Sequence, residues 1–290
     1  MIYSPLRYPG GKGKLAPFMK YMLEKTKHKG GTYIEPFAGG AGIALDLLLN
    51  NIVNQIVIND LDKGIYSFWR AVLTDTDRFI EKINDVSLNM EVWYEQRDVV
   101  LSSHNRYSFD LGFAIFFLNR TNVSGIINGG VIGGLKQNGN WKLDARFNKQ
   151  ELIKRIMNIA DRKSQIRLYN KDVSSFISRY LPKYKNNSLV YFDPPYFSKG
   201  KQLYLNFFGN DEHIRIEKMI REEVDCDWII TYDDVPEIAD IYKDYNLRRF
   251  DLNYSAATKR KASEIMIFKD DKMIPEIQEL IERKIFINLR

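Results

Sequence analysis

The sequence predicts an α/β fold in which a mainly parallel β-sheet is interrupted by a mostly helical insertion. Short runs rich in β-branched and aromatic residues alternate with helical patterns, which is typical of such a sheet. The alternation stops between about residues 63 and 162, where the pattern is largely helical. With 290 residues, of which 44% are hydrophobic, the chain can form one large domain, or one domain that carries a smaller inserted one.

Seven runs are expected to form the strands of the sheet. The first of them is followed by a glycine-rich turn and then by a helix from about Ile43 to Leu49. Helical patterns also lie between most of the later runs. The seven expected strands are Thr32–Phe37, Gln55–Asn59, Ile166–Tyr169, Ser188–Phe192, Trp228–Tyr232, Leu247–Leu252 and Glu264–Phe268.

The insertion is expected to be a helical domain. A glycine-rich piece from residue 125 to residue 139, with GGVIGG at its centre, is interpreted as a β-hairpin or a long loop. We therefore expect a discontinuous α/β domain, residues 1–62 and 165–290, around an inserted domain, residues 63–164. The expected helices of the insertion are Ile65–Leu73, Asp77–Ile83, Met90–Val100, Phe109–Leu118 and Gln150–Ala160.

Positive charge is concentrated in the second half of the insertion. The chain has 43 Lys and Arg against 37 Asp and Glu, which makes its net charge +6. Nine basic and three acidic residues lie between Arg120 and Lys163, so this segment alone carries +6. A basic surface is typical of proteins that bind a polyanion such as nucleic acid. The residues expected to make these contacts are Arg120, Lys136, Lys142 and Arg146.

The cysteine content and the hydropathy pattern indicate a protein of the cytoplasm. Cys226 has no second cysteine to pair with, which favours a reducing compartment. It lies in the apolar run 226–232, so a buried, inert thiol is expected. The first 14 residues are polar and glycine-rich. No stretch reaches the length of about 18 apolar residues that a membrane helix needs, so no membrane association is expected.

The segment Asp193-Pro194-Pro195-Tyr196 carries the strongest chemical signal. It follows the apolar run Leu189–Phe192 at the carboxyl end of an expected strand, where open α/β sheets bind ligands. The prolines donate no N–H, so the carbonyl of Pro194 and the carboxylate of Asp193 form a pair of acceptors. With the flat face of Tyr196, they suit an exocyclic amino group on an aromatic base. The plain alternative is a rigid turn that leaves a strand.

A second motif, EPFAGGAG at residues 35–42, follows the first expected strand. Its glycines allow the backbone to approach a ligand closely. It is not a dinucleotide fingerprint, because Leu45 stands where the third glycine would be. Asp60, 18 residues after Gly42, ends the next strand, where an acid typically accepts hydrogen bonds from a ribose diol. The alternatives are a glycine turn without a ligand and an Asp60 that only caps the following helix.

The N-terminal segment RYPGGKGK, residues 7–14, resembles a phosphate loop but departs from it. A Walker A motif needs glycine where Tyr8 stands and serine or threonine where Leu15 stands, which disfavours an ATPase or GTPase. The segment still suits a nucleoside-like cofactor. The three histidines, His28, His104 and His213, show no metal-binding spacing, so no metal is expected.

Taken together, the motifs resemble those of a known family. RYPGGK, EPFAGGAG, NDLD and DPPY occur in this order, with a helical insertion before the last, as in the Dam-type, alpha-group adenine DNA methyltransferases. The resemblance spans almost the whole chain. It implies a Rossmann-like sheet that binds S-adenosylmethionine and an inserted target-recognition domain with a β-hairpin. The implied reaction is methyl transfer to the N6 amino group of adenine in double-stranded DNA.

The resemblance also implies roles for individual residues. Asp193 and the Pro194 carbonyl would accept the amino hydrogens of a flipped-out adenine whose ring stacks on Tyr196, so the tyrosine hydroxyl is expected to matter less than the ring. The expected catalytic residues are Asp193, Pro194, Pro195 and Tyr196. The residues expected to bind the cofactor are Tyr8, Gly11, Lys12, Phe37, Gly39, Asp60, Asp172 and Asp193.

Two positions depart from the family pattern. Asn128 lies near the place where relatives that read GATC carry a base-reading arginine. It is therefore expected to contact DNA, but the GATC specificity is not transferred. Ala41 stands where many members have a glycine, which bears on the exact cofactor contacts.

Two other functions stay open at this point. A DPPY site also suits the amino group of cytosine, or of adenine in RNA. A DNA-binding protein that has lost its activity is the second alternative, but it predicts damaged cofactor motifs, and the motifs of this chain are intact. A cognate restriction endonuclease that acts separately is compatible with the resemblance.

Overall fold

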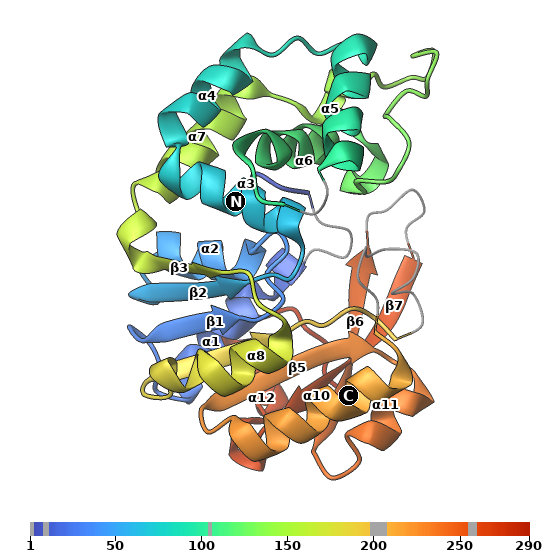
Figure 1. The fold of residues 1–290 in the computed structure, drawn as a ribbon. Helices are drawn as coiled ribbons and strands as arrows, with labels where there is room; N and C mark the ends of the chain where they lie inside the picture. The colour runs from blue at the N-terminus through green and yellow to red at the C-terminus, as the bar shows by residue number, and fades with distance from the viewer. Residues whose placement is uncertain (1–2, 8–11, 104–105, 198–207, 255–259) are drawn as a thin grey trace.

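The computed structural model describes residues 3–7, 12–103, 106–197, 208–254 and 260–290. They form a seven-stranded sheet with the order β3-β2-β1-β4-β5-β7-β6 (Figure 1). The first five strands of this order are parallel, and β7 is antiparallel to both of its neighbours. After β1 the chain adds β2 and β3 on one side of this strand and β4 and β5 on the other, so the strand order changes direction between β1 and β4, as in Rossmann-type folds. The strands are β1 Thr32–Glu35, β2 Gln55–Asn59, β3 Ile166–Tyr169, β4 Ser188–Phe192, β5 Asp227–Asp233, β6 Leu247–Tyr254 and β7 Arg260–Phe268.

The strands confirm the fold class that the sequence predicts. β2, β3 and β4 have the expected bounds, whereas β1 ends two residues early, at Glu35, and β5, β6 and β7 are longer than expected. The central strand β4 is buried at all five positions, in keeping with its continuous apolar run. The edge strand β3 is buried only at Ile166.

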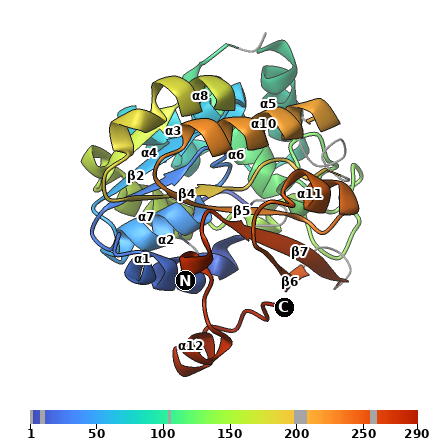
Figure 2. The same cartoon turned by 90° about the horizontal axis from the view of Figure 1, so that it is seen from below.

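Helices cover both faces of the sheet and enclose two cores (Figure 2). Side chains of β1 alternate between them: Tyr33 joins the core under α1 and α2, and Ile34 joins the core under α8 and α10. The helices of the first face are α1 Ala16–Lys25 and α2 Gly42–Leu49. Those of the second face are α8 Val173–Arg179, α10 Asn210–Glu223 and α11 Pro236–Ile241, and α12 Ile277–Glu282 lies near the C terminus.

The helical insertion lies above the sheet in Figure 1 and is built around one buried helix, α6. Phe116 of α6 packs against Phe68 and Phe79, with ring centroids 6.0 and 5.4 Å apart. The core around these rings is continuous with the core under α1 and α2. The helices are α3 Lys63–Thr74, α4 Thr76–Asp85, α5 Met90–Ser102, α6 Phe109–Thr121 and α7 Lys149–Ala160.

Polar side chains determine where four of these helices begin. Each accepts a hydrogen bond from the backbone N–H three residues later, which satisfies a donor that has no partner within the helix. This explains why α3 begins two residues before the apolar pattern from which its start was predicted. The capping residues are Asp62, Asn89, Ser108 and Asn148.

The β-hairpin expected in the glycine-rich piece is not formed. Residues 122–147, named here the insertion loop, make a long irregular connection, which is the other interpretation of the sequence. One isolated antiparallel bridge joins Asn122 to Val131. The backbone turns repeatedly through left-handed conformations, which interrupt a regular strand. These positive φ angles occur at Ser124, Gly125, Gly133, Gly134 and Gln137.

Gln137 holds the insertion loop together from within. Its side-chain nitrogen donates to the carbonyls of Ile132 and Gly134, both at 2.7 Å, and its side-chain oxygen accepts from Leu143 N at 2.9 Å. Three backbone groups that could have joined a hairpin ladder are therefore bound to one side chain. The loop keeps a defined shape without strands.

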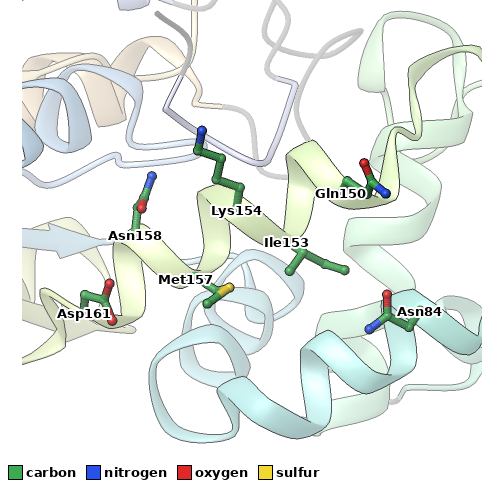
Figure 3. Close-up of a pocket in the computed structure, with 7 residues that line it drawn as sticks. All are labelled: Asn84, Gln150, Ile153, Lys154, Met157, Asn158 and Asp161. Carbon is green, nitrogen blue, oxygen red and sulfur yellow. The ribbon is translucent and has the colours of Figure 1, made fainter.

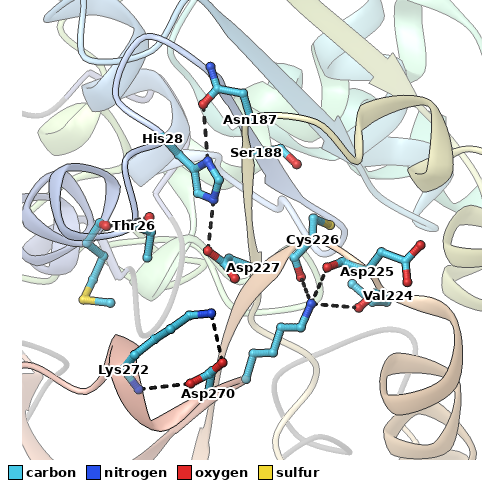
Figure 4. Close-up of polar contacts among 12 residues, drawn as sticks. Thr26, His28, Asn187, Ser188, Val224, Asp225, Cys226, Asp227, Asp270 and Lys272 are labelled. Carbon is cyan, nitrogen blue, oxygen red and sulfur yellow. Dashed lines mark hydrogen bonds and ion pairs between the residues drawn. The ribbon is translucent and has the colours of Figure 1, made fainter.

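The amino edge of the sheet is fixed by polar contacts around His28 (Figure 4). Nε2 of His28 lies 3.0 Å from Asp227 Oδ2, and Nδ1 lies 3.3 Å from Asn187 Oδ1. The hydrogen bond with His28 holds the pKa of Asp227 below its usual value. The neighbouring Cys226 is buried, as expected, and burial raises the pKa of its thiol. This edge ties α1 to the starts of β4 and β5 and lies opposite the carboxyl edge.

Candidate active site

The carboxyl ends of β1, β2 and β3 are joined by side chains at the end of β2. Asn59 donates from Nδ2 to the carbonyls of Pro36 at 2.9 Å and Lys171 at 3.0 Å. The Asp60 carboxylate accepts a hydrogen bond from Gly39 N at 2.8 Å. The glycine turn and Asp60 therefore lie together at one edge of the sheet, as their positions at strand ends predict.

Asp60 shapes the glycine turn and does not cap a helix. Its second oxygen accepts from Asp62 N at 2.9 Å, and the cap of α3 is the Asp62 carboxylate, which accepts from Ile65 N. Burial, reinforced by the charge of Asp62, raises the pKa of Asp60 to about 7. The ionised form of such a carboxylate is stabilised by any ligand that donates hydrogen bonds to it.

The glycine turn itself is rigidly held. Gly39 and Ala41 both have φ of 46°, a left-handed conformation that costs glycine little and alanine more. Trp69 of α3 donates from Nε1 to the carbonyl of Gly39 at 2.9 Å. Beneath the turn the buried Glu35 accepts from Ala44 N at 3.1 Å, and burial raises the pKa of Glu35 to about 8.

Two further residues expected at the cofactor lie near the same edge. Phe37 is half-buried and packs edge-to-face on Phe208, with ring centroids 5.8 Å apart. Asp172 follows the neighbouring strand β3 and is exposed. Its carboxylate accepts from Ser174 N at 3.0 Å, so it also caps α8.

Asp193 follows β4 at this edge, and its carboxylate is held through one oxygen. Oδ1 accepts from Thr231 Oγ1 at 3.1 Å and lies 3.4 Å from Lys12 Nζ. Within the part of the chain that the structure describes, no hydrogen bond reaches Oδ2, and the side chain is 26% exposed. Burial raises the pKa of Asp193, and the Lys12 ammonium opposes this rise.

Lys12 is buried at the centre of this arrangement, in the short 3₁₀ helix Lys12–Leu15. Its Nζ donates to Thr231 Oγ1 at 3.3 Å, pairs with Glu264 and lies 5.3 Å from the centroid of the Tyr196 ring. Burial alone would lower the pKa of Lys12, but Asp193 and Glu264 raise it above its ordinary value. The neighbouring Tyr8 and Gly11, also expected at the cofactor, lie outside the described residues.

The remainder of the DPPY motif is anchored to β5 and β7. Pro194 is buried, Pro195 is half-buried and Tyr196 is 8% exposed. The Tyr196 hydroxyl donates to Glu264 Oε1 at 2.7 Å. Directly after the motif, Phe197 N donates to Asp233 Oδ1 at 2.9 Å.

Sequence reasoning missed two polar residues of this site, Thr231 and Glu264. Thr231 lies within the apolar run of β5 and also exchanges a hydrogen bond of 2.6 Å with the hydroxyl of Tyr191. Glu264 precedes the apolar run 265–268 of β7 and is 1% exposed. Both interrupt strands that are otherwise buried and apolar. Buried polar groups require partners, and this was the signal that could have indicated them.

The family model of the D12 class N6 adenine-specific DNA methyltransferases matches residues 8–256. The chain belongs to this family. It is also 26% identical, over 235 residues, to the Type II methyltransferase M.MjaIII of Methanocaldococcus jannaschii, with 75% of this chain and 78% of the relative covered. The matched range includes the glycine turn, Asp60, the insertion and the DPPY motif.

Similar solved structures include a methyltransferase from Pyrococcus furiosus, which is 11% identical with a TM-score of 0.35 over 87% of this chain and 82% of that one. Another is the rRNA methyltransferase aviRa from Streptomyces viridochromogenes, which is 13% identical with a TM-score of 0.37 over 90% and 86% of the two chains.

This family assignment determines the type of reaction. The protein is a DNA methyltransferase that acts on the N6 amino group of adenine, and it requires a methyl donor. Adenine in DNA is thus favoured over cytosine or RNA, the other targets that the DPPY motif allows. An adenine-specific enzyme is favoured over an inactive DNA-binding homologue.

The basic residues that the methyltransferase was expected to use for DNA lie on and around the insertion loop. Arg120 donates from Nε to the carbonyl of Arg146 at 2.7 Å. Lys142 donates to the carbonyls of Gln137 and Gly139 at 2.6 and 3.0 Å. These two side chains therefore help to shape the loop. Four of the predicted residues are exposed on it: Asn128, Lys136, Lys142 and Arg146.

The insertion loop of the methyltransferase is tied to the N-terminal segment. Asn119 accepts from Arg7 N at 2.6 Å and donates to the carbonyls of Arg7 and Gly125 at 2.7 and 2.9 Å. The Arg7 guanidinium donates to the carbonyl of Asn122 at 3.1 Å. The loop is thus held next to the segment that leads to Lys12.

A separate cavity of about 420 Å³ lies between α4 and α7 and contains none of the site residues (Figure 3). Among the residues that the structure describes, no three His, Cys, Asp or Glu side chains are grouped to hold a metal. The same residues include no helix with the length and apolar character needed to cross a bilayer. The cavity is lined by Asn84, Gln150, Ile153, Lys154, Met157, Asn158 and Asp161.

Proposed function

We propose that this enzyme uses S-adenosylmethionine to methylate an adenine that leaves the base stack of double-stranded DNA. The observation that carries the proposal is the placement of Asp193. It lies at the carboxyl edge of the sheet, with Oδ1 held by Thr231 and Lys12 and with Oδ2 free of hydrogen bonds from the described residues. An acceptor that is oriented and still available suits a substrate amino group.

The residues at the ends of β1 to β3 fit the proposed cofactor. Gly39 brings the backbone close to a ligand, and Asp60 beside it is placed to accept hydrogen bonds from ribose hydroxyls. The half-buried ring of Phe37 supplies an aromatic surface, and Asp172 lies after the next strand, within the expected reach of the adenine ring. Bound there, the cofactor supplies an electrophilic methyl group. Tyr8 and Gly11 belong to the proposal from the sequence alone.

The sequence assigns Lys12 to the cofactor, and the contacts of its side chain suggest a further role. Its ammonium is buried against Asp193 and Glu264, so we propose that it acts on the DPPY motif through these carboxylates. Its positive charge favours the ionised form of Asp193, which is the form that accepts hydrogen bonds through both oxygens.

In the proposed reaction Asp193 Oδ2 and the Pro194 carbonyl each accept a hydrogen bond from one N–H of the adenine amino group. The nitrogen lone pair is thereby localised and directed at the methyl group, so positioning and electrostatics supply the rate. The carboxylate is also placed to receive the proton that the nitrogen releases after transfer. Because Tyr196 is only 8% exposed, adenine can stack on its ring only after neighbouring side chains move.

We propose that DNA phosphates bind beside a cluster of arginines at the base of the insertion loop. Among the described residues no carboxylate pairs with Arg7, Arg120 or Arg146. Burial and the charges of Arg7, Arg155 and Arg146 lower the pKa of Arg120 to about 9. Positive charge without carboxylate partners is typical of phosphate-binding surfaces. The insertion, residues 63–164, is on this proposal the target-recognition domain.

The insertion loop also presents an exposed tryptophan. Trp141 is 71% exposed, whereas Trp69, Trp93 and Trp228 are each 1% exposed. Leu135 on the same loop is 62% exposed, and Lys136 beside it is exposed. An aromatic side chain among basic residues suits contact with a base or sugar. We therefore place Trp141 on the DNA-contacting surface.

Binding of duplex DNA is expected to shield Trp141 from solvent. Acrylamide quenches exposed indole rings, so the quenching of intrinsic fluorescence should fall when duplex DNA is added. Trp141→Phe should remove most of the quenchable signal in free protein and the change on binding. An unchanged quenching constant in the saturated complex would show that DNA lies elsewhere.

The reaction itself is tested by nucleoside analysis. Purified protein is incubated with S-adenosylmethionine and mixed-sequence duplex DNA. The DNA is then digested to nucleosides, which are identified by mass spectrometry. We expect N6-methyladenine, formed only when S-adenosylmethionine is present. Methylation of cytosine instead, or of RNA in preference to duplex DNA, would contradict the proposal.

The relative from Methanocaldococcus jannaschii is named a Type II methyltransferase. We infer from it that this enzyme also belongs to a restriction-modification system, with a cognate restriction endonuclease that acts separately on the same sequence. The cytoplasmic location expected from the sequence is part of this proposal, because the DNA substrate lies there.

A further inference from the structure

Behind the DPPY motif lies a carboxylate that the mechanism described above does not use. Glu264 in β7 is 1% exposed, and each of its oxygens has a different partner. Oε1 accepts from the Tyr196 hydroxyl at 2.7 Å, and Oε2 pairs with Lys12 Nζ. A buried carboxylate is costly unless such donors compensate for lost hydration, so we expect Glu264 to fix the positions of Tyr196 and Lys12 in turn.

Tyr196 and Lys12 both lie next to the proposed reaction centre. Tyr196 is the aromatic residue of the motif, and Lys12 Nζ lies 3.4 Å from Asp193 Oδ1. Thr231 closes the arrangement, because its hydroxyl is within hydrogen-bond distance of both Lys12 and Asp193. Glu264 can therefore orient both the ring of Tyr196 and the cation beside Asp193.

We propose that Glu264 is a positioning residue for methyl transfer: it holds the Tyr196 ring and the Lys12 ammonium in the places from which they act on adenine and on Asp193. This inference rests on the proposed role of Asp193. The sequence led us to expect that the Tyr196 hydroxyl matters less than its ring. The buried hydrogen bond with Glu264 changes this expectation. Tyr196→Phe should lower the rate as well, although the ring remains.

The direct test is Glu264→Gln, which keeps the shape of the side chain and removes its charge. We expect kcat to fall at least about tenfold, because the groups around the reacting nitrogen lose their alignment. The Kd for S-adenosylmethionine, measured by calorimetry, should stay within about threefold, because Glu264 lies in β7, which β4 and β5 separate from the glycine turn and Asp60 at the ends of β1 and β2. A purely structural role would lower the folded fraction and leave kcat per folded molecule unchanged.

The pH profile supplies a second readout. The ionisable groups near Asp193 are Lys12, Glu264, Glu35, Tyr33, Tyr191 and Tyr232. Without the negative charge of Glu264, the positive charge of Lys12 acts on Asp193 unopposed, so the pKa of Asp193 should fall. Because the ionised carboxylate is the active form, the acidic limb of kcat should move to lower pH. Lys12→Gln should move that limb in the opposite direction.

A matched control and a double variant complete the test. Glu217 on α10 is also a buried glutamate, 3.7 Å from Arg221, but it lies outside the site, so Glu217→Gln should retain wild-type kcat and pH profile. The effects of Tyr196→Phe and Glu264→Gln should not add, because they break the same contact. Wild-type kcat and an unmoved limb in folded Glu264→Gln would overturn the inference. Wild-type activity in Asp193→Ala would instead overturn the proposed mechanism.

Discussion

Replacement of Asp193 by alanine is expected to abolish methyl transfer and leave the protein folded. The rate should fall by at least about 10²–10³-fold, because the carboxylate both binds the amino group and aims its lone pair. The loss of a hydrogen bond to a charged group weakens substrate binding by a further about 1.5–3 kcal/mol. The structure explains why folding should survive: Lys12 keeps Glu264 as its counter-charge when Asp193 is removed.

The measurement is transfer of a labelled methyl group to mixed-sequence duplex DNA, made under single-turnover conditions so that chemistry is separated from product release. Circular dichroism checks the fold, and calorimetry checks that S-adenosylmethionine still binds. Asp193→Asn should also be strongly impaired, since its amide offers one acceptor oxygen in place of two. If folded Asp193→Ala methylated adenine at the wild-type rate, the assignment of this residue would be wrong.

Affinity for S-adenosylmethionine is expected to depend on pH through Asp60. Its pKa is raised to about 7, mainly by burial, so free protein at lower pH carries the protonated acid. Ribose hydroxyls donate to the ionised carboxylate, so binding below the pKa must first remove a proton. The Kd should therefore rise by up to about tenfold for each pH unit below the pKa and level off above it.

Asp60→Asn should remove this pH dependence and weaken binding by about 1.5–3 kcal/mol, or roughly 10- to 100-fold in Kd. Titration calorimetry at several pH values between about 5.5 and 8.5 measures both effects. Asp46→Asn is the matched control, because Asp46 on α2 also has a pKa raised by burial, but its carboxylate accepts a hydrogen bond from Asn50 and lies outside the site. A wild-type Kd in Asp60→Asn, with the same pH dependence, would place the ribose elsewhere.

Much of the fold could be predicted because its signals are local. The apolar run at β4 shows a strand buried on both faces, and the motif that follows must then lie at a strand end. The same reasoning brought the glycine turn and Asp60 to one edge of the sheet, where the bond from Gly39 N joins them. The helix starts were less accurate, because capping depends on single polar side chains such as Asp62.

The insertion loop shows where local signals were insufficient. Its glycines were compatible with a hairpin and with a loop, and the choice depended on tertiary partners. Gln137 binds three backbone groups of the loop, and Arg120 and Lys142 donate to further carbonyls. Arg120 and Lys142, which the sequence predicts only as DNA contacts, thus also stabilise the shape of the loop.

The sequence by itself determined the sheet, the four motifs and the reaction that they resemble. The tertiary structure alone decided which groups surround the catalytic carboxylate. Glu264 lies 68 residues from Tyr196 and 252 from Lys12 along the chain, yet it contacts both. These contacts exist because β7 inserts antiparallel between β5 and β6, and this pairing places Glu264 opposite Asp233 at the end of β5, the strand next to β4. Strand order is set by the packing of the whole sheet, so no local pattern around Glu264 could reveal its partners.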